Sequence, residues 1–214
     1  MKLPTLPLFL LTLSLAAPPL RGQSHSHHAG DSGTDPQCHD ASAHQAMGET
    51  EQDSQPVFRD VELLDQRGRR IHFFTDLVKG RTVVVQSMFT TCTTICPPMG
   101  ANFAKLQKKL GRGSDVHLIS VSIDPGVDTP QRLKAWQARF GGNDANWTLV
   151  TGSKRKVDSL LKSLGLFSPD KVDHSPTVLL GSEPANHWTR TNGLANPDKL
   201  LQILDEIREP SHTR

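Results

Sequence analysis

The chain has 214 residues, of which 36% are hydrophobic and 21% are charged. This composition supplies enough apolar material for one folded core and excludes a wholly disordered chain. Residues 1–22 contain Lys2 and Arg21 and no acidic residue; without them, basic and acidic residues are equal in number, at 22 each. A neutral chain lacks the positive charge that nucleic acid or an anionic membrane surface attracts, so we expect neither partner.

The first 22 residues read as a targeting segment. Lys2 precedes an apolar stretch at 3–17, and small residues follow at Gly22 and Ser24. A membrane-spanning helix needs about 20 apolar residues, and this shorter stretch also contains Pro4 and Pro7. We therefore expect a signal peptide over 1–22 and no stable membrane insertion. The mature chain is then exported, to the bacterial periplasm, where thiols meet an oxidising environment.

Residues 23–55 form a polar tail without Leu, Ile, Val, Phe or Trp, so we expect this segment to be disordered. The tail carries half of the ten histidines of the chain, and Cys38 adjoins one of them: His25, His27, His28, His39 and His44. Short His-rich tracts bind zinc, nickel or copper in some proteins and are plain solvated linkers in others. Both interpretations remain open. Cys38 is the odd thiol of three, which fits a free ligand, an intermolecular disulfide or a residue without a role.

The remaining sequence alternates strand and helix patterns. Two short apolar runs at 57–64 and 70–74 flank a Gly-containing turn, which predicts a β-hairpin. Further strands are expected at 82–89, 116–123, 147–150 and 177–180, with 187–191 pairing the last of them. Four helices are expected between or after these strands, from the spacing of their apolar residues and from their ends: Gly111, Thr129-Pro130, Gly165 and Asn196-Pro197. This alternation predicts an α/β fold, a central mixed sheet with helices on both faces.

Two cysteines follow the strand at 82–89. Cys92 lies in the turn, and Cys96 stands where the next helix should begin, with Pro97 in its first turn. Functional groups gather at the carboxyl ends of strands in open α/β sheets, and the N-terminus of a helix favours a thiolate. Two cysteines four positions apart can close a disulfide or chelate one soft ion if the loop brings their sulfur atoms together. An inert structural disulfide or a pair of buried thiols is the alternative.

A third candidate ligand, His174, lies in the loop before the strand at 177–180. In a thioredoxin-like sheet this loop faces the turn that carries the cysteines. Beside two thiolates, an imidazole completes a set of two sulfur donors and one nitrogen donor, which suits copper, with zinc as the alternative.

Three motifs together make the sequence similar to the Sco (SenC) family of thioredoxin-like copper proteins, which serve assembly of the copper centre of cytochrome c oxidase. They are FTTCTTICP at 89–97, VSIDP with DTP at 121–130, and VDH at 172–174. The resemblance implies that Cys92, Cys96 and His174 bind copper, as Cu(I) or Cu(II). It also implies a thioredoxin-like Sco domain over 56–209, with the hairpin as an N-terminal addition and a short C-terminal tail at 210–214.

The family resemblance makes an exported copper chaperone the leading hypothesis, with the copper-receiving subunit of cytochrome c oxidase as partner. The alternative is a thiol–disulfide oxidoreductase in which Cys92 and Cys96 are the catalytic pair and a thioredoxin-like protein supplies the electrons. Pro176 stands where thioredoxins carry a cis-proline, which keeps this activity open. A peroxiredoxin ranks last, because its signature requires Pro and Thr seven and three residues before the nucleophile. Val85 and Phe89 occupy those positions for Cys92, and for Cys96 only Thr93 fits.

Three further residues near the motifs have ordinary structural interpretations. Asp128 precedes Thr129 and is expected to help cap a helix or form a turn. A hydrogen bond that orients a ligand, or contact with a partner, is the alternative for it. Asp124 fits either turn formation or a hydrogen bond that orients a ligand. Met99 follows Cys96 by three positions and is expected to pack in the core.

Overall fold

The computed structural model describes residues 55–171 and 173–208. The expected signal peptide, all but the last residue of the His-rich tail, and the C-terminal segment at 210–214 lie outside the described residues. Twelve elements follow one another along the described chain: β1 (Glu62–Asp65), β2 (Arg70–His72), the π-helix η1 (Phe73–Val78), β3 (Thr82–Met88), α1 (Cys96–Leu110), β4 (Val116–Ser122), α2 (Pro130–Arg139), β5 (Trp147–Thr151), α3 (Lys154–Leu164), β6 (Thr177–Ser182), β7 (His187–Asn192) and α4 (Pro197–Arg208).

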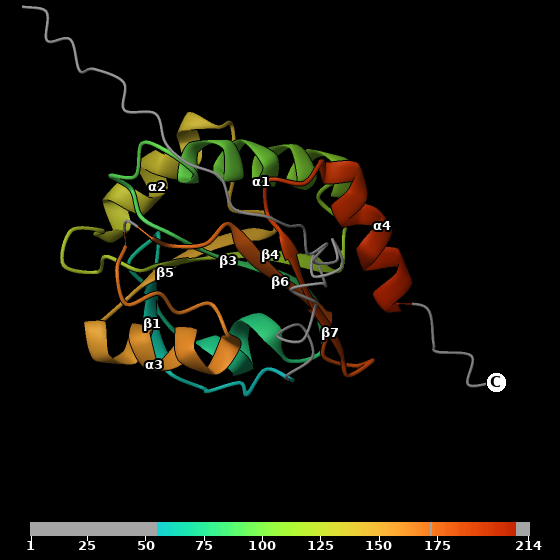
Figure 1. The fold of residues 1–214 in the computed structure, drawn as a ribbon, viewed down its shortest axis with the longest axis horizontal. Helices are drawn as coiled ribbons and strands as arrows, with labels where there is room; N and C mark the ends of the chain where they lie inside the picture. Colours follow the sequence, from blue (N-terminus) through green and yellow to red (C-terminus); the bar gives the residue numbers. More distant parts are fainter. Residues whose placement is uncertain (1–54, 172, 209–214) are drawn as a thin grey trace, which may run out of the picture. The chain divides into compact units, whose positions relative to one another are not determined.

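The strands form one mixed sheet in the order β2-β1-β5-β4-β3-β6-β7. The central strands β5, β4 and β3 are parallel, whereas β1 and β2 on one side and β6 and β7 on the other pair antiparallel. Figure 1 shows α1, α2 and α4 over one face of the sheet and α3 with η1 over the other. The predicted α/β, thioredoxin-like architecture with an N-terminal β1–β2 hairpin is therefore confirmed.

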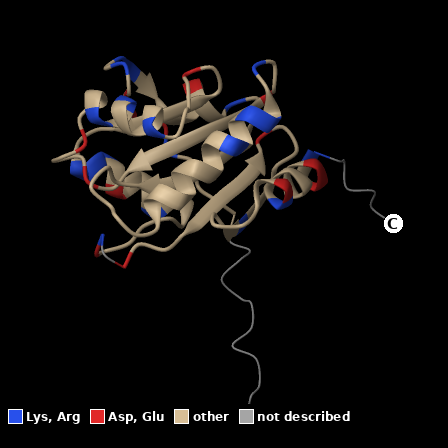
Figure 2. Cartoon of the chain, turned by 90° about the horizontal axis from the view of Figure 1, so that it is seen from above, with Lys and Arg blue, Asp and Glu red and all other residues tan. Residues whose placement is uncertain are grey.

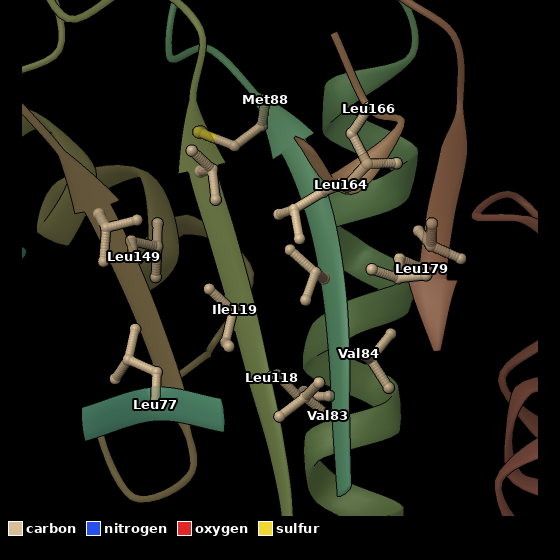
Figure 3. Close-up of a cluster of buried hydrophobic side chains, with 14 of the residues drawn as sticks. Leu77, Val83, Val84, Met88, Leu118, Ile119, Leu149, Leu164, Leu166 and Leu179 are labelled. Atoms are coloured by element: carbon tan, nitrogen blue, oxygen red, sulfur yellow. The ribbon is translucent and has the colours of Figure 1, made fainter. Parts of the chain in front are cut away.

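The core lies on both faces of the central strands. Every residue of β3 is buried, and Val83, Val84 and Val85 are fully so. Such a continuous β-branched run is typical of a strand that is covered on both faces. Figure 3 shows side chains of β3, β4, β5 and β6 packed with Leu77 of η1 and Leu164 of α3. Burial of such side chains stabilises the fold by roughly 1.5–3 kcal/mol each and gives the site a rigid base.

The expected helix ends are confirmed. Thr129 caps α2, since its hydroxyl accepts a hydrogen bond from the amide of Arg132, and Pro130 occupies the first turn. Gly165 ends α3 in the left-handed conformation, which glycine adopts without the steric cost of a Cβ atom.

The first hairpin differs from the sequence prediction at both outer ends. β1 begins at Glu62 rather than at residue 57, and β2 gives way after His72 to the π-helix η1, which the sequence analysis did not foresee. The carboxylate of Asp60 accepts hydrogen bonds from the amides of Phe74 and Thr75. Because these amides are taken by a side chain, they are not available to a strand ladder, and the chain turns into η1 instead.

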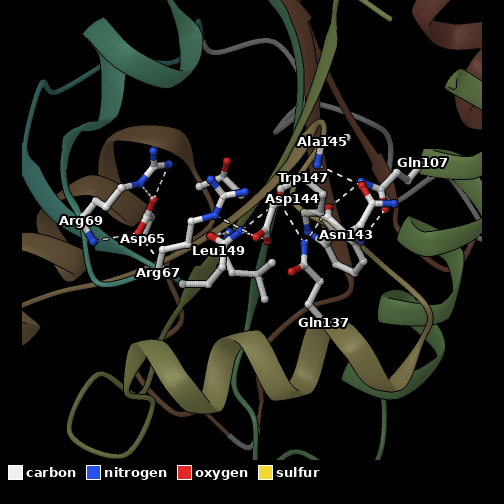
Figure 4. Close-up of polar contacts among 12 residues, drawn as sticks. Asp65, Arg67, Arg69, Gln107, Gln137, Asn143, Asp144, Ala145, Trp147 and Leu149 are labelled. Atoms are coloured by element: carbon white, nitrogen blue, oxygen red, sulfur yellow. Dashed lines mark hydrogen bonds and ion pairs between the residues drawn. The ribbon is translucent and has the colours of Figure 1, made fainter. Parts of the chain in front are cut away.

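Polar side chains fasten the end of the sheet where the parallel strands begin. Gln107 and Gln137 both donate to the carbonyl of Asn143, and Gln66 and Arg67 from the hairpin turn both donate to Asp144 (Figure 4). This network closes the loop before β5 and leaves the opposite end of the sheet, where β3 and β4 terminate, for the cysteines.

Candidate metal centre

Cys92 lies in the turn between β3 and α1, next to the N-terminus of the helix. Its amide donates to the carbonyl of Phe89 at 3.2 Å, which closes the turn. Its Sγ atom accepts the amide of Cys96 at 3.4 Å and lies 3.6 Å from the hydroxyl of Thr94. Ile95, the residue before the helix, provides no side-chain cap, so the sulfur of Cys92 takes one of the unpaired amides of α1.

Cys96 is the first residue of α1 and is fully buried. Its Sγ atom lies 3.2 Å from Nε2 of His174, which the loop between α3 and β6 supplies. His174 is only 5% exposed, and its ring meets the ring of Phe89 edge-on, with centroids 5.9 Å apart. The structure therefore brings two of the three predicted ligands into direct contact and places the third beside them.

The tautomer of His174 follows from its other contact. Nδ1 lies 3.0 Å from the carbonyl oxygen of Ser175. A carbonyl oxygen can only accept, so the ring proton resides on Nδ1 and the lone pair of Nε2 faces Cys96. Burial lowers the pKa of His174 below its usual range, partly opposed by the bond to Ser175. A neutral imidazole with a free Nε2 is the form that ligates a metal.

The two cysteines differ in acidity. Burial opposes ionisation of Cys92, but hydrogen bonds from Cys96 and Thr94 outweigh it and lower the pKa of Cys92 below the usual value. Burial raises the pKa of Cys96 strongly, and hydrogen bonding to Cys92 and the nearby charges of Cys92 and Asp128 add to the rise. Cys92 is half-buried and Cys96 is buried, so we expect Cys92 to be the more reactive thiol.

The donor set fits a soft metal ion, although the side chains are not arranged around one. Within the described parts of the chain, no three His, Cys, Asp or Glu side chains already stand in a metal-binding arrangement. The sulfur of Cys92 accepts the amide of Cys96. Two thiolates and a neutral imidazole are a donor set suited to copper.

Asp128 makes a contact closer to the alternative interpretation of this residue, a hydrogen bond near the ligands, than to the favoured one. The expectation of helix capping or turn formation is incomplete, because Thr129 caps α2 and the carboxylate of Asp128 instead reaches the cysteine turn. It accepts bonds from the amide and hydroxyl of Thr90, two positions before Cys92, and from the hydroxyl of Ser122 at the end of β4. A carboxylate that precedes a helix cap in sequence can point to either end of its loop, so the sequence alone does not reveal this contact.

Two other residues near the motifs behave differently. Asp124 forms an ion pair with Lys171 at 2.8 Å, which joins the loop after β4 to the loop that carries His174. Met99 is buried, as expected for a packing residue. Cys38 and the tail histidines lie outside the described residues.

A thioredoxin-like sheet with a Cys-x-x-x-Cys turn and a buried histidine opposite it defines a class of redox and metal-binding proteins. The SCO1/SenC family model matches residues 49–209, and the chain belongs to this family. A SCO1 protein homologue of Bacillus subtilis is 37% identical over 155 residues, which cover 69% of this chain and 79% of the relative. A Stutzerimonas stutzeri protein to which copper binding is ascribed is 32% identical over 69% of this chain and 74% of its own length.

Solved structures give the same result. A SCO1/SenC family lipoprotein from Bacillus anthracis superposes with a TM-score of 0.62 at 30% identity, covering 72% of this chain and 96% of that chain. BsSco, a member of the Sco family of cytochrome c oxidase assembly proteins with a disulfide switch, gives 0.61 at 29% identity and covers 72% and 94%. No helix among the described residues is long and apolar enough to cross a membrane.

Proposed function

We propose that this chain is an exported copper chaperone of the bacterial periplasm that binds copper through Cys92, Cys96 and His174. Its recipient is the copper-receiving subunit of cytochrome c oxidase. The observation that carries the proposal is the 3.2 Å contact between Sγ of Cys96 and Nε2 of His174, with Cys92 at the mouth of the same site. Family membership, the Stutzerimonas relative and the BsSco structure support both the cargo and the role in oxidase assembly.

The arrangement suits capture and release of a metal ion. Cys92 is half-buried at the edge of the site and its pKa is lowered, so it offers the first thiolate to incoming copper. Cys96 and His174 lie behind it, buried, and exclude water from the ion once it is held. Copper supplies the charge that makes deprotonation of Cys96 favourable, because a coordinating thiol gives up its proton. Transfer of copper to a partner then begins with the exchange of Cys92, the more accessible ligand, for a ligand of the partner.

Copper titration of the reduced full-length chain tests the proposal. One copper ion should bind with a strong visible charge-transfer band for Cu(II) bound to thiolate. The variant with both Cys92→Ser and Cys96→Ser should lose that band, and the matched variant Cys38→Ser should keep it. Because the tail contains five histidines, weaker copper binding without the thiolate band is assigned to the tail. Survival of the band in the double variant would refute the proposed ligands.

The second candidate function is reduction of a partner's disulfide, favoured by the unequal acidity of the cysteines. The Cys92 thiolate would attack one sulfur of the partner's disulfide and release the other as a thiol. Cys96 would then lose its proton and displace the partner from the mixed disulfide, which leaves a Cys92–Cys96 disulfide and two partner thiols. A thioredoxin-like dithiol protein would reduce this disulfide again. Turnover of a model disulfide by the metal-free protein, abolished by Cys92→Ser, tests this activity.

A further inference from the structure

Asp128 is a buried carboxylate that the copper ligands do not explain. It is 1% exposed and lies in the loop between β4 and α2. Its partners are hydrogen-bond donors rather than a cation: the amide of Thr90 lies 3.2 Å from both carboxylate oxygens, the hydroxyl of Thr90 donates to Oδ1, and the hydroxyl of Ser122 donates to Oδ2 at 2.6 Å. A buried carboxylate is costly unless its hydrogen bonds are well satisfied. Positive charge also lies around this network: Lys171 interacts electrostatically with Asp128, and Nε of Arg132 donates to the hydroxyl of Thr90 at 3.4 Å.

Thr90 occupies a critical position between two parts of the site. The residue before it, Phe89, carries the ring that contacts the ring of His174, and its carbonyl accepts the amide of Cys92. Fixing both the backbone and the side chain of Thr90 therefore fixes Phe89 on one side and the cysteine turn on the other. Ser122 ties the same carboxylate to the end of β4, which pairs with β3 throughout its length. The cysteine turn is thus anchored, through Thr90 and Asp128, to the rigid central sheet.

We propose that Asp128 is a positioning residue for copper binding. By holding Thr90 against the end of β4, it fixes the position of the cysteine turn relative to Phe89, whose ring contacts His174. This inference rests on the proposed function. Asp128 itself need not touch the metal. Groups of this kind, which orient metal ligands through a hydrogen bond, typically contribute 10–100-fold to metal affinity.

The test uses two kinds of substitution at the same hydrogen bonds. Asp128→Asn keeps the shape of the side chain but replaces one acceptor oxygen by a donor and removes the charge. Thr90→Val removes the hydroxyl donor, and Thr90→Ser keeps it. Asp65→Asn is the matched control. Asp65 is also 1% exposed and also accepts backbone amides, those of Arg67 and Arg69, as well as the side chain of Arg69 (Figure 4). It lies at the end of β1, three strands across the sheet from β3, which leads into the cysteine turn.

Two readouts separate positioning from general destabilisation. Copper affinity, measured by competition with a chelator, should fall at least tenfold in Asp128→Asn and in Thr90→Val, with a shifted Cu(II) charge-transfer band. Thr90→Ser should restore both to wild type, and Asp65→Asn should leave both unchanged even if it lowers the melting temperature. In the metal-free proteins, alkylation of Cys92 should slow at least threefold in the same two variants, because a displaced turn loses the amide of Cys96.

Affinity and Cys92 alkylation rates within threefold of wild type in a folded Asp128→Asn protein would overturn the inference. If Asp128→Asn does not fold, the copper affinity and the Cys92 alkylation rate of Thr90→Val are compared with those of Thr90→Ser. Values within threefold of each other would likewise overturn the inference. Failure of the wild-type protein to bind copper would instead refute the proposed function. The metal-free alkylation rates would then still show whether Asp128 positions the turn.

Discussion

The Sγ atom of Cys96 and the Nε2 atom of His174 lie 3.2 Å apart, although 78 positions separate the two residues in the sequence. The contact exists because β6, which follows the histidine loop, pairs with β3, which precedes the cysteine turn. The two loops therefore leave the sheet from neighbouring strands and meet above the same edge.

His174→Ala separates copper binding from thiol–disulfide chemistry. Loss of one of three donors should lower copper affinity by more than the 10–100-fold that follows loss of an orienting group. The Cys92–Cys96 redox couple should survive, because the helix N-terminus beside Cys92 is untouched. Chelator competition and the reduction potential against glutathione measure the two properties. His187→Ala, at an exposed position of β7, is the control. Unchanged copper affinity in His174→Ala would remove His174 from the site.

The two thiols should differ in their reactivity. In a reduced Cys38→Ser background, iodoacetamide should label Cys92 well before Cys96. The rate for Cys92 should rise with pH and level off at a lower pH than for an ordinary thiol, because its pKa is lowered. The pKa of Cys96 is raised and its side chain is buried, so it should react only when the fold opens. Peptide mass spectrometry measures both rates. Preferential labelling of Cys96 would contradict the geometry.

Mild oxidation should close a reversible disulfide between Cys92 and Cys96 and leave Cys38 free. Both motif cysteines are free thiols in the structure, and a hydrogen bond already joins the turn and the helix start that carry them. The oxidised protein should lose the thiolate charge-transfer band, because two of its three donors are consumed. Mass spectrometry of the digested protein identifies the bridge. A dominant bridge from Cys38 to either motif cysteine would show that the pairing is wrong.

His117 should make the fold sensitive to acid. Burial and the nearby charge of Arg81 lower its pKa to about 4, and its ring contacts the hydroxyl of Thr148. Between pH 6.5 and 4, His117 is protonated in the unfolded chain but stays neutral in the folded chain. The free energy of unfolding therefore falls as the pH falls. The slope is at most about 1.4 kcal/mol per pH unit. Urea unfolding of His117→Gln should show a shallower decline across this window than wild type, whereas the exposed control His187→Gln should not.

Charged residues of both signs are mixed over the described part of the chain (Figure 2). Lys and Arg are interspersed with Asp and Glu around the described part of the chain in the view of Figure 2, without a large region of one sign.

Much of this protein was determined by its sequence alone. The period of apolar residues, the Thr129-Pro130 and Gly165 helix ends and the buried run of β3 specify the order of strands and helices, because these signals act over a few neighbouring residues. Cys92, Cys96 and His174 were identifiable as candidates from residue type and motif spacing. Their donor types indicated copper, with zinc as the alternative, and the family resemblance implied copper.

Only the tertiary structure decided the contacts between distant segments. The bond of Asp60 to the amides that begin η1, and the bond of Asp128 to Thr90, join residues 14 and 38 positions apart. A carboxylate accepts whichever amide or hydroxyl the folded chain presents to it, so its partner depends on how the loops are placed by the sheet. The same reason applies to the cysteines. Their order was visible in the sequence, but only the fold buries Cys96 beside His174 and leaves Cys92 half-buried at the helix N-terminus.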